Sequence, residues 1–411
     1  MTFDEARKVI EDQFKPAVLG EEEAVLLEAY NRVLSEDVIS TLDIPPFNRS
    51  TVDGYAVRAE DTFGAEENQP VNLKVCGIVN VGEQPNLVLS KGEAVEIVTG
   101  APIPEGANAA VMIEDTERED VELHVFGAVT VNENVMKRGS DIKSGEVVLK
   151  KGQVLGSSEI GVLAALGLTA VKVSKIPMVA VLSTGGEVTE PGKVLPAGKI
   201  YDINAYSLST AVIESGAKPV YFGVVPDDRA ALSKALQTAL DSADMVITSG
   251  GVSVGPRDYT PQIVDSLGKP GIVVYGIAVK PGKPTTVGFV GNKPVFSLPG
   301  HPTSALLIFY LLARPLIQRL AGRPVAGMKM VRAVAGSRMF SAKGRRTFVM
   351  VKLEFDKDCR LIAEPVEAGA SGAITTLAKA DGFVEIPENE QFIDVNDEVA
   401  VVLFRNVSGK A

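Results

Sequence analysis

The sequence predicts a multidomain protein of mixed α/β and β architecture, built around a central, doubly wound parallel sheet. Three observations lead to this fold class. The chain has 411 residues, which is more than a single hydrophobic core normally supports. Between residues 175 and 321, apolar strand-like runs alternate with helical patterns, as in a sheet covered by helices on both faces. Short β-type runs separated by Gly, Pro and Asn occupy much of the remaining chain.

The N-terminal part is expected to be helical up to about residue 40. Thr2 stands three residues before Glu5, a spacing typical of a capped helix start. A second amphipathic helix is predicted for LEAYNRVLSEDV, residues 27–38. The next stretch, TLDIPPFNRSTVDGYAVRAED, predicts extended chain followed by a turn at Asp53 and Gly54.

An all-β module is predicted between about residues 70 and 150. Its expected strands are VNLKVCGIVNV, EAVEIVT, AAVMIED, AVTVNEN and GEVVLKKG. The segment SSEIGVLAALG, residues 157–167, then returns to helical spacing.

The α/β region begins at about residue 175, where the runs become longer and apolar throughout. Its expected strands are MVAVLST, KPVYFGVV, DMVITS, GIVVYGIAV and PVFSL. Its expected helices are INAYSLSTAVIESG, DRAALSKALQTALD, PQIVDSLG and TSALLIFYLLARPLIQRL. From residue 322 onward the chain is β-rich again, which predicts a small C-terminal barrel or sandwich.

Composition excludes several classes of function. The formal net charge of −11 disfavours generic binding to nucleic acid or to a membrane surface. Cys76 and Cys359 are the only cysteines, so we expect neither a disulfide framework nor a zinc site. The N-terminus has no apolar signal core, and the longest apolar run, residues 305–313, is too short to cross a bilayer. We therefore expect a cytoplasmic protein.

Five loops carry the residues that could perform chemistry. Ligands of open parallel sheets bind outside the carboxyl ends of the strands. The loops that follow the expected strands contain Glu187, Asp227 with Asp228, Asp258, Lys280 with Lys283, and Ser304. Glycine-rich backbone and helix N-termini bind anions, and lysines add point charges for phosphate or another oxyanion. Carboxylates in such a site indicate a bridging Mg²⁺.

Each loop also has a simpler explanation. Asp258, or the pair Asp227 and Asp228, could cap a helix. The KPGKP segment could be a solvated turn, and Asp53 could be a simple turn residue. The two histidines, His124 and His301, are more typical of packing or capping than of catalysis. Because several such loops occur at one predicted sheet edge, a binding site is the favoured interpretation.

At this point the motifs resemble those of a known family. They are PPFNRSTVDGYAVRAED, VTGAPIPEGANAAVMIEDT, KRGSDIKSGE, STGGEV, SGGVSVGPRDYT, KPGKP and LPGHPTSALL. In this order and spacing they are similar to the molybdopterin molybdotransferases, the MoeA and gephyrin E-domain family, over essentially the whole chain. The resemblance implies Mg²⁺-dependent insertion of molybdate into adenylylated molybdopterin, with release of AMP.

The resemblance also implies an organisation. The chain would comprise an N-terminal domain (1–44 and 142–174), an inserted β module (45–141), an α/β molybdopterin-binding domain (175–321) and a C-terminal β-barrel (322–411). The α/β domain would resemble molybdopterin adenylyltransferase. The protein would be a homodimer that binds molybdopterin-adenylate, with the adenylyltransferase of the preceding step as a candidate partner, and with no nucleic acid or membrane partner.

Site residues follow from the resemblance, motif by motif. The implied catalytic residues are Asp53, Thr99, Asp141 and Glu187. The implied metal ligands are Asp227, Asp228 and Asp258. The implied substrate and anion ligands are Ser249, Gly250, Gly251, Ser253, Lys280, Lys283, Pro299, Pro302, Ser304, Arg345 and Ser371.

Three positions depart from the family pattern, and two other functions remain open. Gly186 stands where the family commonly has an aspartate, His301 replaces an asparagine, and Met350 stands where a second arginine is often found. The alternatives are the adenylyltransferase activity itself, which would consume ATP, and a non-catalytic scaffold or anchoring protein.

Overall fold

The computed structural model describes residues 1–16, 19–251, 259–325, 327–366 and 375–404. The chain divides into two compact units. The large unit comprises Met1–Ser35, Gly152–Gly156 and Ala170–Ala411, and the small unit comprises Glu36–Lys151 and Ser157–Thr169. Within the described ranges, no helix is both long and apolar enough to cross a membrane.

The small unit is built on a six-stranded sheet of order β7-β4-β6-β5-β9-β8. The strands are β4 (Gly54–Val57), β5 (Val71–Val79), β6 (Glu93–Ile97), β7 (Ala109–Met112), β8 (Thr116–Glu119) and β9 (Glu122–Val125). The small unit also contains the two-stranded pairs β2 (Val38–Ile39) with β11 (Val147–Leu149) and β3 (Arg49–Ser50) with β10 (Val135–Met136), the helix α2 (Ser157–Ala165), and the 3₁₀ turns η1 (Ala59–Thr62) and η2 (Ile113–Asp115). The predicted β module is thus confirmed.

One predicted strand of this module is wrong. The segment AVTVNEN, residues 128–134, ends in a turn at residues 131–134. Asn132 and Asn134 both adopt positive φ, at 70° and 56°. Asparagine tolerates this left-handed region better than most residues, so the two asparagines favour a turn over the alternating pattern of the valines.

The N-terminal segment forms one helix, not two. Helix α1 (Phe3–Gln13) begins with the expected capping box of Thr2 and Glu5. The chain then forms β1 (Glu21–Val25), which pairs with β12 (Ala170–Ser174). The predicted helix at residues 27–38 is wrong. Val33 and Leu34 instead make isolated antiparallel bridges, and Asn31 turns the chain with a φ of 62°.

The α/β sheet of the large unit has the strand order β16-β13-β17-β21-β20-β18. The strands are β13 (Met178–Thr184), β16 (Lys218–Val225), β17 (Met245–Ser249), β18 (Pro270–Tyr275), β20 (Thr286–Val290) and β21 (Lys293–Leu298). Only β20 runs against the others, because it pairs antiparallel with both β21 and β18. The sequence did not predict β20. The other five strands share one direction, so their carboxyl ends meet at one edge.

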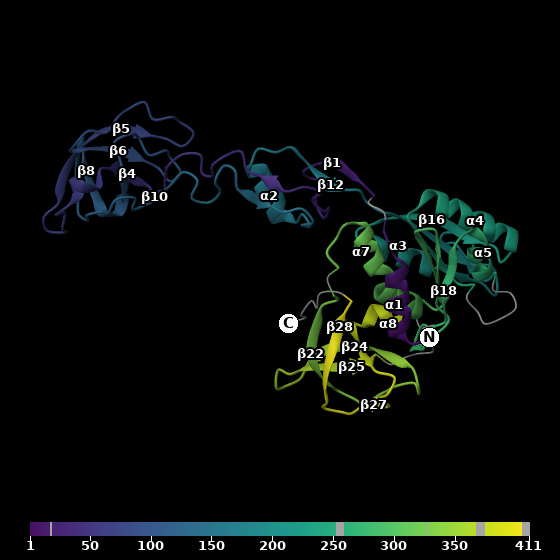
Figure 1. Cartoon of the computed structure of the whole chain (residues 1–411). Coiled ribbons are helices and arrows are strands. Elements are labelled where there is room, and N and C mark those ends of the chain that lie inside the picture. Colours follow the sequence, from purple (N-terminus) through teal and green to yellow (C-terminus); the bar gives the residue numbers. More distant parts are fainter. Residues whose placement is uncertain (17–18, 252–258, 326, 367–374, 405–411) are drawn as a thin grey trace. The chain divides into compact units, whose positions relative to one another are not determined.

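Helices cover both faces of this sheet, as a doubly wound fold requires (Figure 1). Ala180 and Leu182 face α4 (Arg229–Ser242) and α5 (Thr260–Leu267). Val179 and Val181 face α3 (Asn204–Glu214), α1 and the C-terminal helical segment. Because successive side chains of a strand alternate between faces, the continuous apolar runs of the sequence are explained by burial on both sides.

The long predicted helix at the end of this domain is confirmed, with an irregular centre. It consists of α6 (Pro302–Ile308), a π-helical turn (Phe309–Ala313) and α7 (Arg314–Leu320). Pro315 lies just after the π turn. A proline has no N–H to donate to the preceding turn, and π turns inside helices are associated with such interruptions.

The C-terminal strands close into a five-stranded barrel of order β24-β25-β22-β28-β26, with β26 pairing back to β24. The elements of this region are β22 (Met330–Ala335), β23 (Met339–Phe340), β24 (Arg346–Phe355), β25 (Leu361–Pro365), α8 (Thr375–Lys379), β26 (Gly382–Ile386), β27 (Phe392–Ile393) and β28 (Glu398–Leu403). The barrel, rather than the sandwich, is therefore the correct alternative.

One predicted strand of the α/β region joins two different sheets. The run GIVVYGIAV is β18 followed by β19 (Val279–Lys280), separated by Gly276 with a φ of 75°. β19 pairs with β24 of the barrel. Helix α1 also lies against the barrel (Figure 1). The ring of Phe3 packs edge-on against that of Phe348, with the ring centroids 5.7 Å apart. Met350 is buried in the same core, so this departure from the family pattern is a packing residue here.

Candidate functional site

Four loops of the α/β domain come together at the carboxyl edge of the sheet. β17 lies between β13 and β21, and β16 flanks β13. The loops at 185–187, 250–251 and 299–302 are therefore neighbours, and the loop at 226–228 lies on the outer side of the first of them. The sequence-based choice of these loops is explained by the shared direction of their strands.

A cavity of about 570 Å³ lies at this edge. Four of the predicted site residues line it: Glu187, Ser249, Gly250 and Pro302. Its other lining residues are Ser183, Thr184, Val188, Leu195, Lys199, Ile200, Tyr201, Asp202, Ile203, Asn204, Gly300 and His301. The size suits a drug-sized or cofactor-sized molecule, and apolar walls with a few polar groups are typical of such sites.

Gly250 and Gly251 of the SGGVSVG segment bring the ends of β13 and β17 into close contact. Gly250 has a φ of 90°, and a Cβ there would lie 2.2 Å from the carbonyl oxygen of Thr184. Gly251 has a φ of 66°, and its Cβ would lie 2.8 Å from Oγ1 of Thr184. Only glycine fits this approach, and Gly250 is itself part of the wall of the cavity.

The two neighbouring aspartates after β16 have different contacts. Asp227 Oδ2 accepts a hydrogen bond from the Gly186 nitrogen at 3.2 Å. Asp228 Oδ1 accepts one from the Ala231 nitrogen at 2.9 Å and caps α4. The capping explanation therefore holds for Asp228, whereas Asp227 contacts the loop that carries Glu187.

Asn204 and Asp202 belong to the site, although the sequence analysis did not select them. Asn204 Nδ2 donates to Ser249 Oγ and to the Gly300 oxygen, both at 2.7 Å. Asp202 Oδ2 accepts from the hydroxyl of Tyr221 at 3.2 Å. Burial and the Asp202 carboxylate raise the pKa of Tyr221. In the sequence, only their position could have indicated these two residues. Asp202 precedes α3 and Asn204 begins it, at the carboxyl edge of the sheet.

The predicted lysines do not line the cavity. Lys280 and Lys283 are exposed, and Lys280 pairs in register with Thr347 of the barrel. In this pairing Arg345, whose side chain is partly exposed, lies one residue before Arg346, the partner of Val279. Pro299 and Ser304 are buried. Ser253, Asp258 and Ser371 lie outside the described residues.

Two predicted residues of the small unit are in direct contact. Asp53 Oδ1 accepts a hydrogen bond from the Thr99 nitrogen at 2.7 Å. The adjacent Gly54 approaches β7 so closely that a Cβ would lie 2.0 Å from the Val111 oxygen. The DGYA and TGAP motifs therefore form one local structure.

Asp141 lies exposed on a second loop of the small unit, next to a pair that the sequence analysis missed. Its backbone nitrogen donates to the Ile44 oxygen at 3.0 Å. Asp43 Oδ2 accepts from Arg138 Nε at 2.7 Å, and Oδ1 accepts from the Ser144 nitrogen at 2.9 Å. The Ser144 amide and Arg138 hold the pKa of Asp43 below its usual value.

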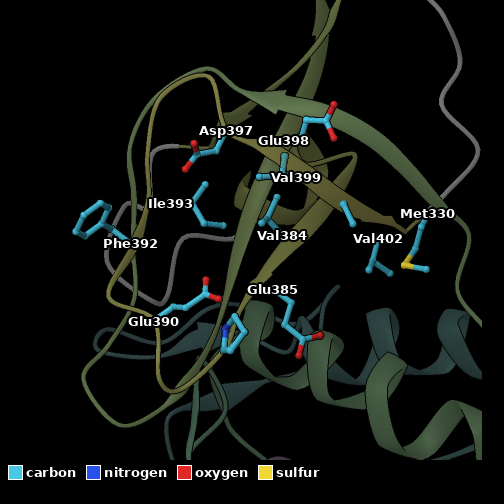
Figure 2. Close-up of a pocket in the computed structure, with 12 residues that line it drawn as sticks. Met330, Val384, Glu385, Glu390, Phe392, Ile393, Asp397, Glu398, Val399 and Val402 are labelled. Atoms are coloured by element: carbon cyan, nitrogen blue, oxygen red, sulfur yellow. The ribbon is translucent and has the colours of Figure 1, made fainter.

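The structure offers no preformed metal centre in the ranges it describes, where no three His, Cys, Asp or Glu residues cluster. A further cavity of about 540 Å³ lies on the barrel. Figure 2 shows the carboxylates of Glu385, Glu390, Asp397 and Glu398 around its apolar floor. Since these charges repel phosphate and molybdate, the cavity at the sheet edge is the better candidate site.

Comparison with known proteins covers the chain from end to end. Residues 1–167 match the MoeA N-terminal region (domain I and II). Residues 180–319 match a "probable molybdopterin binding domain", and residues 332–404 match the MoeA C-terminal region (domain IV).

Individual relatives match over similar lengths. A molybdopterin molybdenumtransferase of Haemophilus influenzae is 34% identical over 416 residues, which is 100% of both chains. One from Nostoc is 34% identical over 92% of this chain and 87% of the relative. A solved molybdopterin biosynthesis MoeA protein of Pyrococcus horikoshii superposes with a TM-score of 0.84 at 43% identity, covering 98% of this chain and 99% of the other. The chain therefore belongs to the MoeA family.

Proposed function

We propose that this protein is a molybdopterin molybdenumtransferase, which inserts molybdate into adenylylated molybdopterin and releases AMP. The observation that carries the proposal is the cavity at the carboxyl edge, where Glu187, Ser249 and Gly250 meet. Its position agrees with the general rule for ligand sites in open α/β sheets. The end-to-end similarity to proteins named molybdopterin molybdenumtransferase supports the same reaction.

In the α/β domain, different residues would bind the ring of the substrate and the oxyanions. The apolar walls and buried polar groups of the cavity suit the uncharged ring of the substrate. Lys280, Lys283 and Arg345 would bind oxyanions, because lysine and arginine side chains donate to such groups without accepting. Glu187 would orient the attacking water as a positioned carboxylate.

Magnesium would be held by oxygen ligands at the outer edge of this site. Asp227 is exposed, and carboxylate oxygen is the ligand type that Mg²⁺ prefers. Asp258 is the second proposed ligand. When bound, Mg²⁺ would polarise the phosphate linkage of the adenylate. Asp228 contributes its side chain to the α4 cap, so we propose Asp227 over Asp228.

We also propose that the chain acts as a homodimer with the four-part division given by its motifs: 1–44 with 142–174, 45–141, 175–321 and 322–411. Light scattering coupled to size exclusion should give twice the mass of one 43.4 kDa chain. A single-chain mass at micromolar concentration would contradict the dimer without affecting the proposed reaction.

The reaction is tested with purified protein, adenylylated molybdopterin, molybdate and Mg²⁺. We expect AMP release together with cofactor that activates an apo-molybdoenzyme, and we expect neither product without molybdate or Mg²⁺. A variant with both Lys280→Ala and Lys283→Ala should show a higher KM for molybdate. Lys269→Ala, at the opposite edge of the sheet, is the matched control. Consumption of ATP with free molybdopterin, and no AMP release from the adenylate, would instead indicate the adenylyltransferase reaction.

A further inference from the structure

Asn204 lies at the first position of α3 and forms part of the wall of the cavity. Its side chain is 8% exposed, which is unusual for an asparagine, since polar residues are mostly on the surface. A buried amide is expected to form hydrogen bonds, because an unpaired polar group is unfavourable in the interior.

Both donor hydrogens of the amide are used to join two loops. Nδ2 donates to Ser249 Oγ at 2.7 Å and to the backbone oxygen of Gly300 at 2.7 Å. The Gly300 oxygen can only accept, so the orientation of the amide is fixed. Oδ1 has no partner in the part of the chain that the structure describes, which leaves these two donor bonds to set the position of the side chain.

Between the described residues of the two loops, the backbone pairing ends early. β17 and β21 pair as far as Ser249 and Leu298, and one further backbone bond runs from the Gly250 nitrogen to the Leu298 oxygen at 3.2 Å. Gly300 lies beyond the end of this ladder. Asn204 therefore supplies a side-chain link between Ser249 and Gly300, and both residues line the cavity.

Asn204 is not needed to begin the helix on which it lies. The first turn of α3 is capped by Asp202, whose Oδ1 accepts from the Ala205 nitrogen at 3.0 Å. A side chain that makes no cap, is buried, and bonds to two other loops has a role outside its own helix.

We propose that Asn204 is a positioning residue for the substrate cavity, which fixes the distance between Ser249 and Gly300 before substrate binds. This inference rests on the proposed function of the same site. Preorganised loops bind a ligand without an ordering cost, so loss of the link weakens binding of the adenylylated molybdopterin. The chemical step depends on other groups and changes little.

The test compares Asn204→Asp with Asn204→Ala. Aspartate keeps the size of the side chain but loses both donors, and it places a second acceptor against the Gly300 oxygen. Alanine removes the link entirely. Ser215→Ala is the matched control, since Ser215 is buried at the opposite end of α3 and its hydroxyl donates to the Ala211 oxygen of the same helix.

Three quantities are measured for each variant: KM and kcat for adenylylated molybdopterin, the melting temperature, and amide exchange of peptides that span residues 248–251 and 298–301. For both Asn204 variants we expect KM to rise roughly tenfold, the effect of about two lost hydrogen bonds, with kcat within about twofold. The two peptides should exchange faster, while Ser215→Ala leaves them unchanged.

An unchanged KM with unchanged exchange overturns the inference. So does a loss of kcat and melting temperature that Ser215→Ala reproduces, because that result marks a general structural role. If the wild-type chain itself releases no AMP, the proposed function fails. The exchange measurement requires no substrate and still decides whether Asn204 holds the two loops.

Discussion

The Asp227 carboxylate accepts a hydrogen bond from the Gly186 backbone nitrogen, with Oδ2 and N 3.2 Å apart. This contact joins the loop after β16 to the loop after β13, and Asp227 is exposed. The next residue, Asp228, is engaged in the cap of α4. Two adjacent carboxylates thus have separate roles, and substitution can separate them.

Asp227→Asn should abolish most Mg²⁺-dependent activity while the fold is retained. The amide oxygen of asparagine can still accept from Gly186, but the charge that would bind Mg²⁺ is lost, so we expect a loss on the order of 100-fold in kcat/KM. Asp228→Asn keeps the cap and should retain activity within a few-fold. Asp228→Ala should instead lower the free energy of unfolding by about 1 kcal/mol. Steady-state kinetics and urea unfolding check both results; equal activity losses for the two asparagine variants would refute the distinction.

Gly186→Asp should be tolerated and should strengthen Mg²⁺ binding. Gly186 has no positive φ and nothing lies within 4 Å of the position of its Cβ. The new carboxylate would lie beside Asp227 and restore the acid that the family commonly has, and more carboxylate ligands increase affinity for hard cations. We expect a melting temperature near that of the wild type and a lower Mg²⁺ concentration for half-maximal activity. Gly185→Asp, at a φ of 140°, is the destabilised comparison.

Asp53 should combine a structural and a chemical role that two substitutions can separate. Its Oδ1 holds the Thr99 nitrogen at 2.7 Å. Asp53→Asn keeps an acceptor for this bond, whereas Asp53→Ala leaves the Thr99 N–H without it. We expect the asparagine variant to melt like the wild type, and the alanine variant to lose about 1 kcal/mol of stability. If Asp53 is catalytic, both variants lose activity; full activity of Asp53→Asn would show that it is a turn residue.

The elements of the α/β domain could be predicted because their patterns are local. A continuous apolar run such as residues 178–184 is a buried strand wherever it lies, and Gly216 ends its helix with a positive φ of 89°. The helix predicted for residues 27–38 was wrong because its structure depends on distant partners. Val33 and Leu34 are buried and form bridges to residues 154 and 173. A local sequence pattern cannot indicate partners that lie more than a hundred residues away.

The candidate site could be predicted only in part for a similar reason. Glycines and charges after strands are visible in the sequence, so Glu187 and Ser249 were selected. Asn204 was missed, because a single asparagine at the start of a helical pattern carries no signal until the strand order places it beside Ser249 and Gly300. The lysines were selected by residue type, but β19 leaves the sheet for the barrel and takes Lys280 away from the cavity.

Gly250→Ala should disrupt the cavity wall. The new Cβ would meet the Thr184 oxygen at 2.2 Å and would have to adopt a φ of 90°. The left-handed backbone alone costs roughly 1–2 kcal/mol, and the clash adds to this figure. Gly300→Ala is the matched control, because the nearest atom to its Cβ lies 3.8 Å away. Urea unfolding should show a loss of at least about 2 kcal/mol for the first variant and little change for the second. Equal stability of the two variants would contradict the close approach.

The free energy of unfolding should fall at acidic pH, because an ion pair between α1 and the barrel is then lost. Arg346 donates to both oxygens of Asp4, at 3.0 and 2.6 Å, and to Glu388 at 3.0 Å. The hydrogen bond from Arg346 holds the pKa of Asp4 below its usual value of 3.8. A depressed pKa in the folded state contributes stability above pH 4, and this contribution is lost as the pH falls through the lowered value.

Asp4→Asn should therefore be less stable than the wild type at pH 7, by up to about 1 kcal/mol because the pair is solvent-screened. The difference should shrink as the pH falls below 4, and it should also shrink in high salt. Glu11→Gln, exposed on the same helix, should show no such pH dependence in urea unfolding. A deficit of Asp4→Asn that persists unchanged at pH 2 would mean that the ion pair does not stabilise this contact.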